Sequence, residues 1–455
     1  MRRRTYTVIL LYVLLSYLMA CENLLIGFYI ISLFFVCTIS LSISYIKTGY
    51  LYIFKGQNYF LLKYFLLHGV GYYTYLLRNS LGLGWYTHSD ALLEKGLGIS
   101  FFACVIFQIC YYFSNKYIKV RQQPFSYLKF KKIFNSYKTK WFILIVGIVS
   151  ACMLLWALMG NVPILIPNYH DSARASVGKG LGGVEALYRG LVSLSLLFYI
   201  YCFKNRKFNK FFCFFLTIMI SLYLLNMDRG GLLIYLLSVG FVYYLCISKF
   251  TLKQCIISFL SIILIAGSMG AMRLKNGNFN DLQLIGAYIF TEASVEFDNY
   301  IEVFNMVENK GELYGSTLVP IITLPVPRAV MPDKDKYLTA GNYFKEYHNH
   351  SHIRVGERIS YIGELYLNWN IAGVIIGMMA MGVLLSVCDR KCDYNSIISI
   401  YLYIQFVNFF SGFVAGDIAT AFIGFFMNNV LVIFFIFGIK WISDIRKHNY
   451  EKNLC

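Results

Sequence analysis

The sequence has 455 residues, of which 58% are hydrophobic and only 14% are charged, and its mean hydropathy is +0.58. Repeated apolar runs of about 18 or more residues are each long enough to cross a bilayer, so the composition predicts an all-α polytopic membrane protein. The formal net charge of +18 does not indicate nucleic-acid binding, because the Lys and Arg residues are distributed over short loops that would lie against anionic lipid headgroups.

The chain begins with Met1-Arg2-Arg3-Arg4, and the apolar run from Thr5 to Cys21 has no small-residue cleavage site. We therefore expect a retained first span and a cytoplasmic N-terminus. The apolar pattern predicts about twelve spans in one transmembrane domain, residues 1–455, which returns the C-terminus to the cytoplasm. The expected spans lie near residues 5–21, 24–46, 57–77, 96–115, 141–160, 187–203, 211–227, 230–248, 254–271, 370–388, 395–414 and 420–440.

Basic residues are concentrated in the loops that this topology places in the cytoplasm. The loop at residues 116–140 contains eight Lys and Arg residues and no acidic residue. The positive-inside rule therefore supports both the number of spans and their orientation. On the outer face we expect a smaller loop at residues 161–186 and a large loop at residues 272–365.

The first part of the large loop has helical periodicity. Between Asp281 and Val307, apolar residues recur near helical spacing at Ile285, Ile289, Ala293, Phe297, Ile301 and Phe304. Acidic residues take other positions, namely Glu292, Glu296, Asp298 and Glu302. This pattern predicts an amphipathic helix that lies at the membrane surface.

A proline-rich segment follows, and its prolines are expected to hold the chain extended and to bar a helix: Pro320, Pro325, Pro327 and Pro332. A stiff backbone presents Arg328 with less ordering entropy than a mobile loop would, and fixed cations suit an anionic ligand such as a pyrophosphate. The other cations expected at this face are Arg174, Lys179, Arg189, Arg229, Lys334, Lys336, Lys345, Arg354 and Arg358.

Three histidines of the large loop alternate along the chain, at His348, His350 and His352. One of them can take a proton or orient a substrate, and the alternative is a polar loop with hydrogen-bonded histidines. We expect no metal, because no carboxylate or Cys stands at convincing ligand spacing. No Cys lies between Ile256 and Val387, where the large outer loop falls, and no CxxC pair occurs in the sequence, so we also expect neither a disulfide framework nor a zinc site.

Two acidic residues stand where polar sequence meets an apolar span. Glu364 lies where the large loop enters a span, so burial is expected to raise its pKa toward acid or base work; the alternative is a carboxylate that caps backbone amides. Asp228 and Arg229 lie in an outer turn, where they form either a ligand-binding pair or an interfacial ion pair.

The stretch "YGSTLVPIITLPVPRAVMPDKDKYL" at Tyr314–Leu338, followed by "RISYIGELYLNWNIAG" at Arg358–Gly373, resembles the bacterial O-antigen polymerases, the Wzy-type oligosaccharide repeat-unit polymerases. In that family a Tyr-Gly, a Pro-Arg, a Pro-x-Lys and a Gly-Glu-x-Tyr-x-Asn-Phe-Gly pattern recur in and after a large outer loop. "NMDRGGLLIYLL" resembles their Arg-Gly before a span. This sequence departs from the family pattern at two points: Asp335 stands where the family has a proline, and Trp369-Asn370 stands where the family has an aromatic residue followed by glycine.

The resemblance implies a membrane glycosyltransferase with a GT-C-like fold that joins undecaprenyl-pyrophosphate-linked oligosaccharides at the periplasmic side of the bacterial cytoplasmic (inner) membrane. No cofactor is implied, and membrane lipid and a chain-length regulator protein are the candidate partners. The expected catalytic residues are Arg229, Arg328, Glu364, His350 and His352. The expected substrate-binding residues are Arg174, Tyr314, Lys334, Arg354 and Arg358.

Three other functions remain open from the sequence. An O-antigen ligase would use the same donor with a lipid A core acceptor. A lipid-linked oligosaccharide flippase or another carrier would be expected to show repeated halves or charged residues at mid-span, whereas this sequence shows no convincing internal repeat and almost no ionisable residue at mid-span. A non-catalytic assembly scaffold would tolerate replacement of the outer arginines.

Overall fold

The computed structural model describes residues 2–18, 23–80, 86–118, 182–206, 210–225, 229–258, 260–261, 295–323, 326, 330–349, 357–430 and 432–433. This part of the chain is built from helices, and its one β contact is an isolated bridge between Leu51 and Phe250. The all-α prediction is therefore confirmed for the described residues.

Three of the described helices are long and apolar enough to cross a membrane: α2 (Leu24–Thr48), α5 (Asp90–Tyr117) and α17 (Tyr361–Lys391). Their local sequence explains their ends. Asn23 caps α2 by accepting hydrogen bonds from two backbone N–H groups, and Gly49 closes it with φ 79°. The structure thus agrees with a membrane protein, while the number of spans stays a prediction.

Shorter helices complete the bundle. Their bounds are α1 (Arg2–Leu18), α3 (Gly56–Phe65), the π-helical segment η1 (Leu66–Val70), α4 (Gly71–Ser80), α9 (Gly182–Lys204), α10 (Lys210–Leu225), α11 (Arg229–Cys246), α18 (Ile397–Gly412) and a helix at Ile418–Val430. The span expected at residues 57–77 is therefore a continuous helical run of α3, η1 and α4. The span expected at residues 141–160 lies outside the described residues.

The centre of the bundle is the contact of α17 with α5. Gly382 of α17 lies so close to α5 that a Cβ atom there would be 2.6 Å from the carbonyl oxygen of Phe107. Small residues permit such approach of two helix backbones inside a membrane. Phe107 also stacks on Phe60 of α3, with the ring centroids 4.6 Å apart, so α3, α5 and α17 share one aromatic core.

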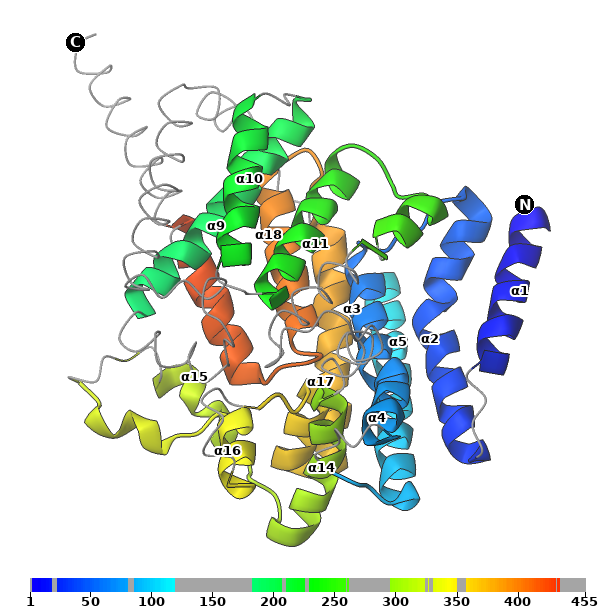
Figure 1. The fold of residues 1–455 in the computed structure, drawn as a ribbon, viewed down its shortest axis with the longest axis vertical. Helices are drawn as coiled ribbons and strands as arrows, with labels where there is room; N and C mark the ends of the chain where they lie inside the picture. The colour runs from blue at the N-terminus through cyan, green and yellow to red at the C-terminus, as the bar shows by residue number, and fades with distance from the viewer. Residues whose placement is uncertain are drawn as a thin grey trace, which may run out of the picture.

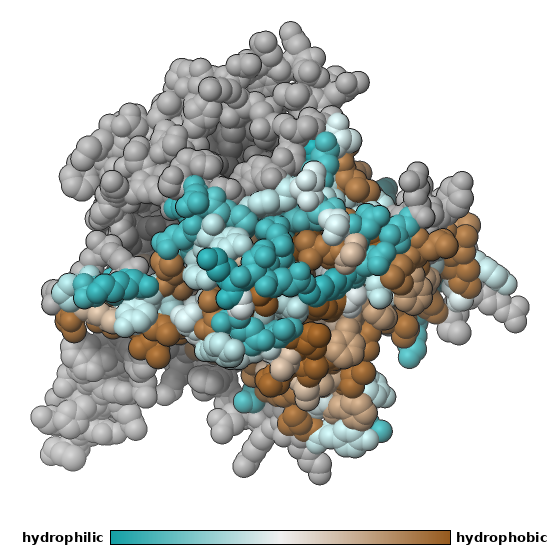
Figure 2. Space-filling view, turned by 90° about the horizontal axis from the view of Figure 1, so that it is seen from below, coloured by the Kyte–Doolittle hydropathy of each residue, from teal (hydrophilic) through white to brown (hydrophobic). Residues whose placement is uncertain are grey.

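A second layer lies at one end of the bundle and consists of α14 (Val295–Lys310), η3 (Ser316–Leu318), α15 (Pro320–Thr323), η4 (Pro332–Lys336) and α16 (Ala340–Tyr347). The N-terminal end of α1 lies toward the opposite end (Figure 1). Figure 2 views the second layer from below and shows hydrophilic residues gathered in a band across the described part of this face, bordered by hydrophobic residues. We call this assembly the outer layer.

The structure corrects two expectations about the outer layer. The described part of the expected amphipathic helix is α14, but its polar residues Asp298 and Glu302 are buried together with its apolar residues. α14 therefore packs inside the protein instead of lying on a membrane surface.

The prolines also act differently from expectation. Pro320 is the first residue of α15 and Pro332 the first of η4. Proline suits these positions because the first turn of a helix needs no backbone N–H from it. These two prolines therefore begin short helices and do not bar them, whereas Pro325 and Pro327 lie outside the described residues.

At the other end of the bundle, Asp389 of α17 holds the start of α3. Its carboxylate accepts hydrogen bonds from the backbone N–H groups of Gly56, at 2.8 Å, and Gln57, at 3.2 Å. It also accepts from the hydroxyl groups of Tyr111, at 2.5 Å, and Tyr403, at 2.6 Å. One side chain thus caps α3 and joins it to α5, α17 and α18.

We expect Asp389→Ala to lower the free energy of unfolding by about 2–4 kcal/mol, because it leaves several partly buried donors without their acceptor. Thermal unfolding of the detergent-solubilised protein measures the effect. The exposed Asp333, which contacts only the nearby Lys336 in the described structure, supplies the control Asp333→Ala. Equal melting temperatures for the two variants would contradict the capping role of Asp389.

Candidate functional site

The two sequence motifs that carry the family resemblance meet in space at the start of α17. The backbone N–H of Leu313 donates to the carbonyl of Leu367 and that of Tyr314 to the carbonyl of Asn368, both at 3.0 Å. The N–H of Gly315 donates to the side-chain oxygen of Asn368 at 2.9 Å. Residues 313–315 are thus fixed to α17 by three consecutive backbone donors.

Glu364 is hydrogen-bonded to a residue that follows this turn and to a distant segment. One carboxylate oxygen accepts from the hydroxyl of Thr317 at 2.9 Å, and the other accepts from the backbone N–H of Ile418 at 2.5 Å. Asn368 donates to the same Thr317 oxygen at 2.8 Å. We call Gly315, Thr317, Glu364, Asn368 and Ile418 the Glu364 network; it joins η3, α17 and the helix at residues 418–430.

The burial of Glu364 limits what its carboxylate can do. The residue is 0% exposed, and each oxygen already accepts a hydrogen bond from the protein. Asp417, the residue before Ile418, caps the helix at residues 418–430 by accepting a hydrogen bond from the N–H of Thr420, at 2.6 Å. This geometry favours a carboxylate that positions two segments of backbone over one that meets a substrate directly.

Helix α17 is interrupted just after this network. Trp369 has φ −145° and Asn370 has φ 53°, so the helical hydrogen-bond pattern breaks between Asn368 and Ile371. Gly315 has φ 86°, and a Cβ atom there would lie 2.9 Å from the Trp369 ring. The position therefore requires glycine both for its left-handed backbone and for the close approach of the indole.

The remaining expected site residues that the structure describes lie at the surface of the outer layer. Tyr314 is exposed, so its ring does not enter the Glu364 network. Lys334 donates to the carbonyl of Val326 at 2.7 Å. Arg358 contacts Glu296 through Nη1 at 2.6 Å. The structure thus does not bring these side chains to Glu364.

Arg229 begins α11, and no side-chain position is described for it. Five other expected site residues lie outside the described residues: Arg174, Arg328, His350, His352 and Arg354. Their roles stay predictions. Within the described ranges, no group of three His, Cys, Asp or Glu side chains is placed to hold a metal ion.

A second group of titratable side chains is buried between α4, α14 and α16. Arg78 Nη1 lies 3.5 Å from Asp298 Oδ2. His88 Nδ1 lies 3.7 Å from one oxygen of Glu302, and His348 Nε2 lies 3.8 Å from the other. We call these five residues the His88 cluster. It joins segments that are more than 200 residues apart in the sequence and so closes the outer layer onto the bundle.

Burial controls the charges of the His88 cluster. It raises the pKa of Asp298 to about 7, although Arg78 opposes this shift. Burial also raises the pKa of Glu302 and lowers that of His88 to about 4. At neutral pH the His88 ring is therefore uncharged, and its contact with Glu302 is not an ion pair.

Sequence reasoning missed the His88 cluster and the role of Thr317 and Asn368. One available signal was the spacing of Asp298 and Glu302, which puts two carboxylates on the same side of a helix. Another was the position of Arg78 and His88 between the spans expected at residues 57–77 and 96–115, which the expected topology puts on the same face as the large loop. Asn368 was part of the quoted motif, but its double role as donor and acceptor needed the structure.

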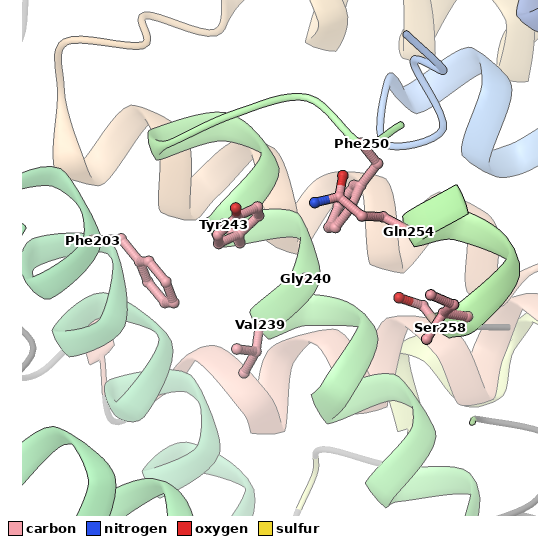
Figure 3. Close-up of a pocket in the computed structure, with 8 residues that line it drawn as sticks. Phe203, Val239, Gly240, Tyr243, Phe250, Gln254 and Ser258 are labelled. Atoms are coloured by element: carbon pink, nitrogen blue, oxygen red, sulfur yellow. The ribbon is translucent and has the colours of Figure 1, made fainter. Parts of the chain in front are cut away.

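A separate cavity of about 330 Å³ lies near the opposite end of the bundle. Figure 3 shows Phe203, Tyr243 and Phe250 around it from three different segments. The other lining residues are Val239, Gly240, Gln254, Ile257 and Ser258, and none of the lining residues is charged. The cavity is therefore not part of the Glu364 network.

Comparison with known proteins found no match to this chain among protein-family models, curated proteins or solved structures. The resemblance to O-antigen polymerases accordingly rests on sequence motifs, at Asn226–Leu237, Tyr314–Leu338 and Arg358–Gly373.

We expect Gly315→Ala to loosen the turn, because an alanine Cβ meets the Trp369 ring and because the left-handed backbone costs a non-glycine residue about 1–2 kcal/mol. Limited proteolysis of the purified protein should then cut residues 316–336 several times faster than in the wild type. Gly311→Ala is a matched control: Gly311 also has positive φ, at 80°, but nothing lies within 4 Å of its Cβ position. Equal cleavage of both variants would show that the Trp369 contact does not hold the turn.

Within the His88 cluster, the imidazole of His88 makes a contribution to stability that is lost in acid, opposite in sign to the contribution of Asp298. The pKa of His88 is about 4 in the folded protein, and its ordinary value of 6.5 serves as the reference for the unfolded chain. Between these values the unfolded state binds a proton on His88 that the folded state does not, so the contribution of His88 to stability falls as the pH falls from about 6.5 to 4. His88→Asn removes this contribution, at most about 3 kcal/mol.

Thermal unfolding of wild type and His88→Asn across this pH range measures the effect. As the pH is lowered, the melting temperature of the variant should rise relative to that of the wild type, whatever the difference between the two at pH 7. A constant difference between the two would contradict a neutral buried His88.

Proposed function

We propose that this protein polymerises polyprenyl-pyrophosphate-linked oligosaccharide repeat units, as in the O-antigen polymerases that its motifs resemble. The observation that carries the proposal is the docking of Tyr314 and Gly315 onto Asn368, with Thr317 on Glu364. Two motifs quoted from separate parts of the sequence thereby form one unit. Motifs that recur together in one family are expected to pack together in its fold.

The reaction is a glycosyl transfer to a hydroxyl of a new repeat unit. The bond between the anomeric carbon and the phosphate oxygen breaks, and the electron pair leaves with the lipid pyrophosphate. The acceptor oxygen forms the new bond and gives its proton to a base. The leaving group is a stable anion that needs no proton donor, so fixed positive charge is the main requirement.

Arginine suits the pyrophosphate because its planar guanidinium donates paired hydrogen bonds to phosphate oxygens. We assign this role to Arg229 and Arg328, assisted by Arg174 or Arg354. Tyr314, Lys334 and Arg358 remain candidates for binding the glycan at the outer surface.

We assign Glu364 as a positioning residue, because its two oxygens hold Thr317 and the start of the helix at residues 418–430. His350 and His352 then remain the candidates for the base that takes the proton of the acceptor hydroxyl.

The proposed setting is a GT-C-like core of about twelve spans with its active face on the periplasmic side and both termini in the cytoplasm. The distribution of charge supports this orientation. Several described basic residues lie at the helix ends far from the outer layer: Lys47, Lys116, Lys204, Arg390 and Lys391. By the positive-inside rule, this distribution favours a cytoplasmic position for that end.

The test is the length distribution of surface polysaccharide from a deletion strain complemented with variants. We expect Arg328→Ala to lower long-chain product roughly 100-fold, the effect of removing a charge that stabilises a transition state. Glu364→Ala should also lose the ladder, whereas Glu364→Gln, which retains one acceptor oxygen, should recover part of it. Loss with Glu364→Gln as complete as with Arg328→Ala would contradict a positioning role and favour proton transfer by Glu364.

Two exposed residues of the outer layer supply matched controls, Lys310→Ala for the cation and Glu346→Gln for the carboxylate. Membrane levels of every variant are measured in parallel. A deletion strain that carries single repeat units on its surface supports a polymerase. A strain with no surface glycan would favour a flippase, and one that accumulates lipid-linked polymer without attachment would favour a ligase.

A further inference from the structure

Exposed apolar side chains in the outer layer are confined to one stretch. Among the described residues from 295 to 360, the large hydrophobic side chains that are exposed are those of Tyr314, Ile322, Val330 and Tyr337. Ile322 is 76% exposed and Val330 is 75% exposed. We call the described residues 314–323 and 330–337 the arm. In α14 and α16, by contrast, the described large apolar side chains are buried or partly buried.

The exposed apolar surface of α17, which we take to face lipid, begins at a definite residue of the helix. Residues 361–368 are buried, and after the break at Trp369 and Asn370 the helix exposes apolar side chains from Ile371 onward. From Ile371 to Arg390 the helix rises roughly 30 Å at 1.5 Å per residue, which matches the hydrocarbon core of a bilayer. The apolar boundary on this side of the molecule therefore falls close to Ile371.

Contacts to α2 and α5 support the same boundary. Asn23, just before the exposed Leu24 of α2, donates to Glu94 of α5 at 2.8 Å. The next residue, Lys95, lies 2.5 Å from Glu308 of α14, and its Nζ is 5.6 Å from the centre of the Tyr366 ring. Polar side chains of three helices thus lie at one level, next to the first lipid-facing residues.

The arm is anchored at this boundary. Its first residues, Tyr314 and Gly315, are hydrogen-bonded to Asn368, three residues before Ile371. In Figure 1, α15 lies to one side of the bundle and above α14 and α16. The start of the arm is therefore held next to Ile371, the first exposed apolar residue of α17 after the break.

We infer that the arm rests on the phospholipid surface, with Ile322 and Val330 inserted among the upper parts of the acyl chains. Removing such exposed aliphatic surface from water is favourable, and the exposed Lys336 can extend its amine to lipid phosphates. The membrane contact of the outer layer thus belongs to the arm and not to α14. This inference does not depend on the proposed glycosyl transfer.

Photocrosslinking of the full-length protein tests the inference. Benzoylphenylalanine replaces Ile322 or Val330 in the chain, which is reconstituted in vesicles of phosphatidylethanolamine and phosphatidylglycerol and irradiated. Ile376, an exposed residue of α17, is the positive control, and Glu346, an exposed residue of α16, is the negative control. Both arm positions are at the surface, so the packed core does not need to accommodate the larger side chain.

We expect lipid adducts, detected by intact mass, at positions 322 and 330 in yields comparable to position 376 and several-fold above position 346. Crosslinks to another segment of the chain or to a second copy would overturn the inference, because the arm would then be covered by protein. Absence of lipid adducts at both arm positions, with position 376 labelled, would overturn it as well.

Discussion

The attachment of residues 313–315 to α17 is the constraint on which the outer layer depends. A helix that enters a membrane cannot leave backbone donors and acceptors unpaired. Here the carbonyls of Leu367 and Asn368, next to the break in α17, receive the N–H groups of Leu313 and Tyr314. The same bonds that satisfy α17 at its interruption therefore fix the start of η3 and, through it, the path of the arm.

The two ends of the bundle use buried carboxylates for related purposes. At one end Asp389 accepts from two N–H groups at the start of α3. At the other, Glu364 accepts from the first N–H of the helix at residues 418–430. In both cases a carboxylate from α17 satisfies a helix N-terminus on a neighbouring segment, where the partial positive charge favours it. α17 thus organises both ends of the structure, which gives Glu364 a structural reason to be present.

Much of the fold could be predicted from local patterns, because the runs in α2, α5 and α17 are long and apolar and Phe297, Ile301 and Phe304 have helical spacing. The surroundings of α14 could not be predicted in this way. Periodicity puts Asp298 and Glu302 on one side of a helix, but it does not reveal that Arg78 and His88 cover that side. Glu364 was found because it stands at a loop boundary, whereas the partners of its oxygens come from distant segments and needed the three-dimensional structure.

The buried titratable groups of the outer layer also balance one another over a range of pH. Between about pH 4 and 6.5 the folded state lacks a proton on His88 that the unfolded state binds. In the same range it holds a proton on Asp298, whose pKa rises from 3.8 to about 7, that the unfolded state has lost. The two differences have opposite signs, so their contributions to the pH dependence of stability cancel there. A cluster that joins the outer layer to the bundle can therefore combine a carboxylate and an imidazole without making that junction sensitive to moderate acid.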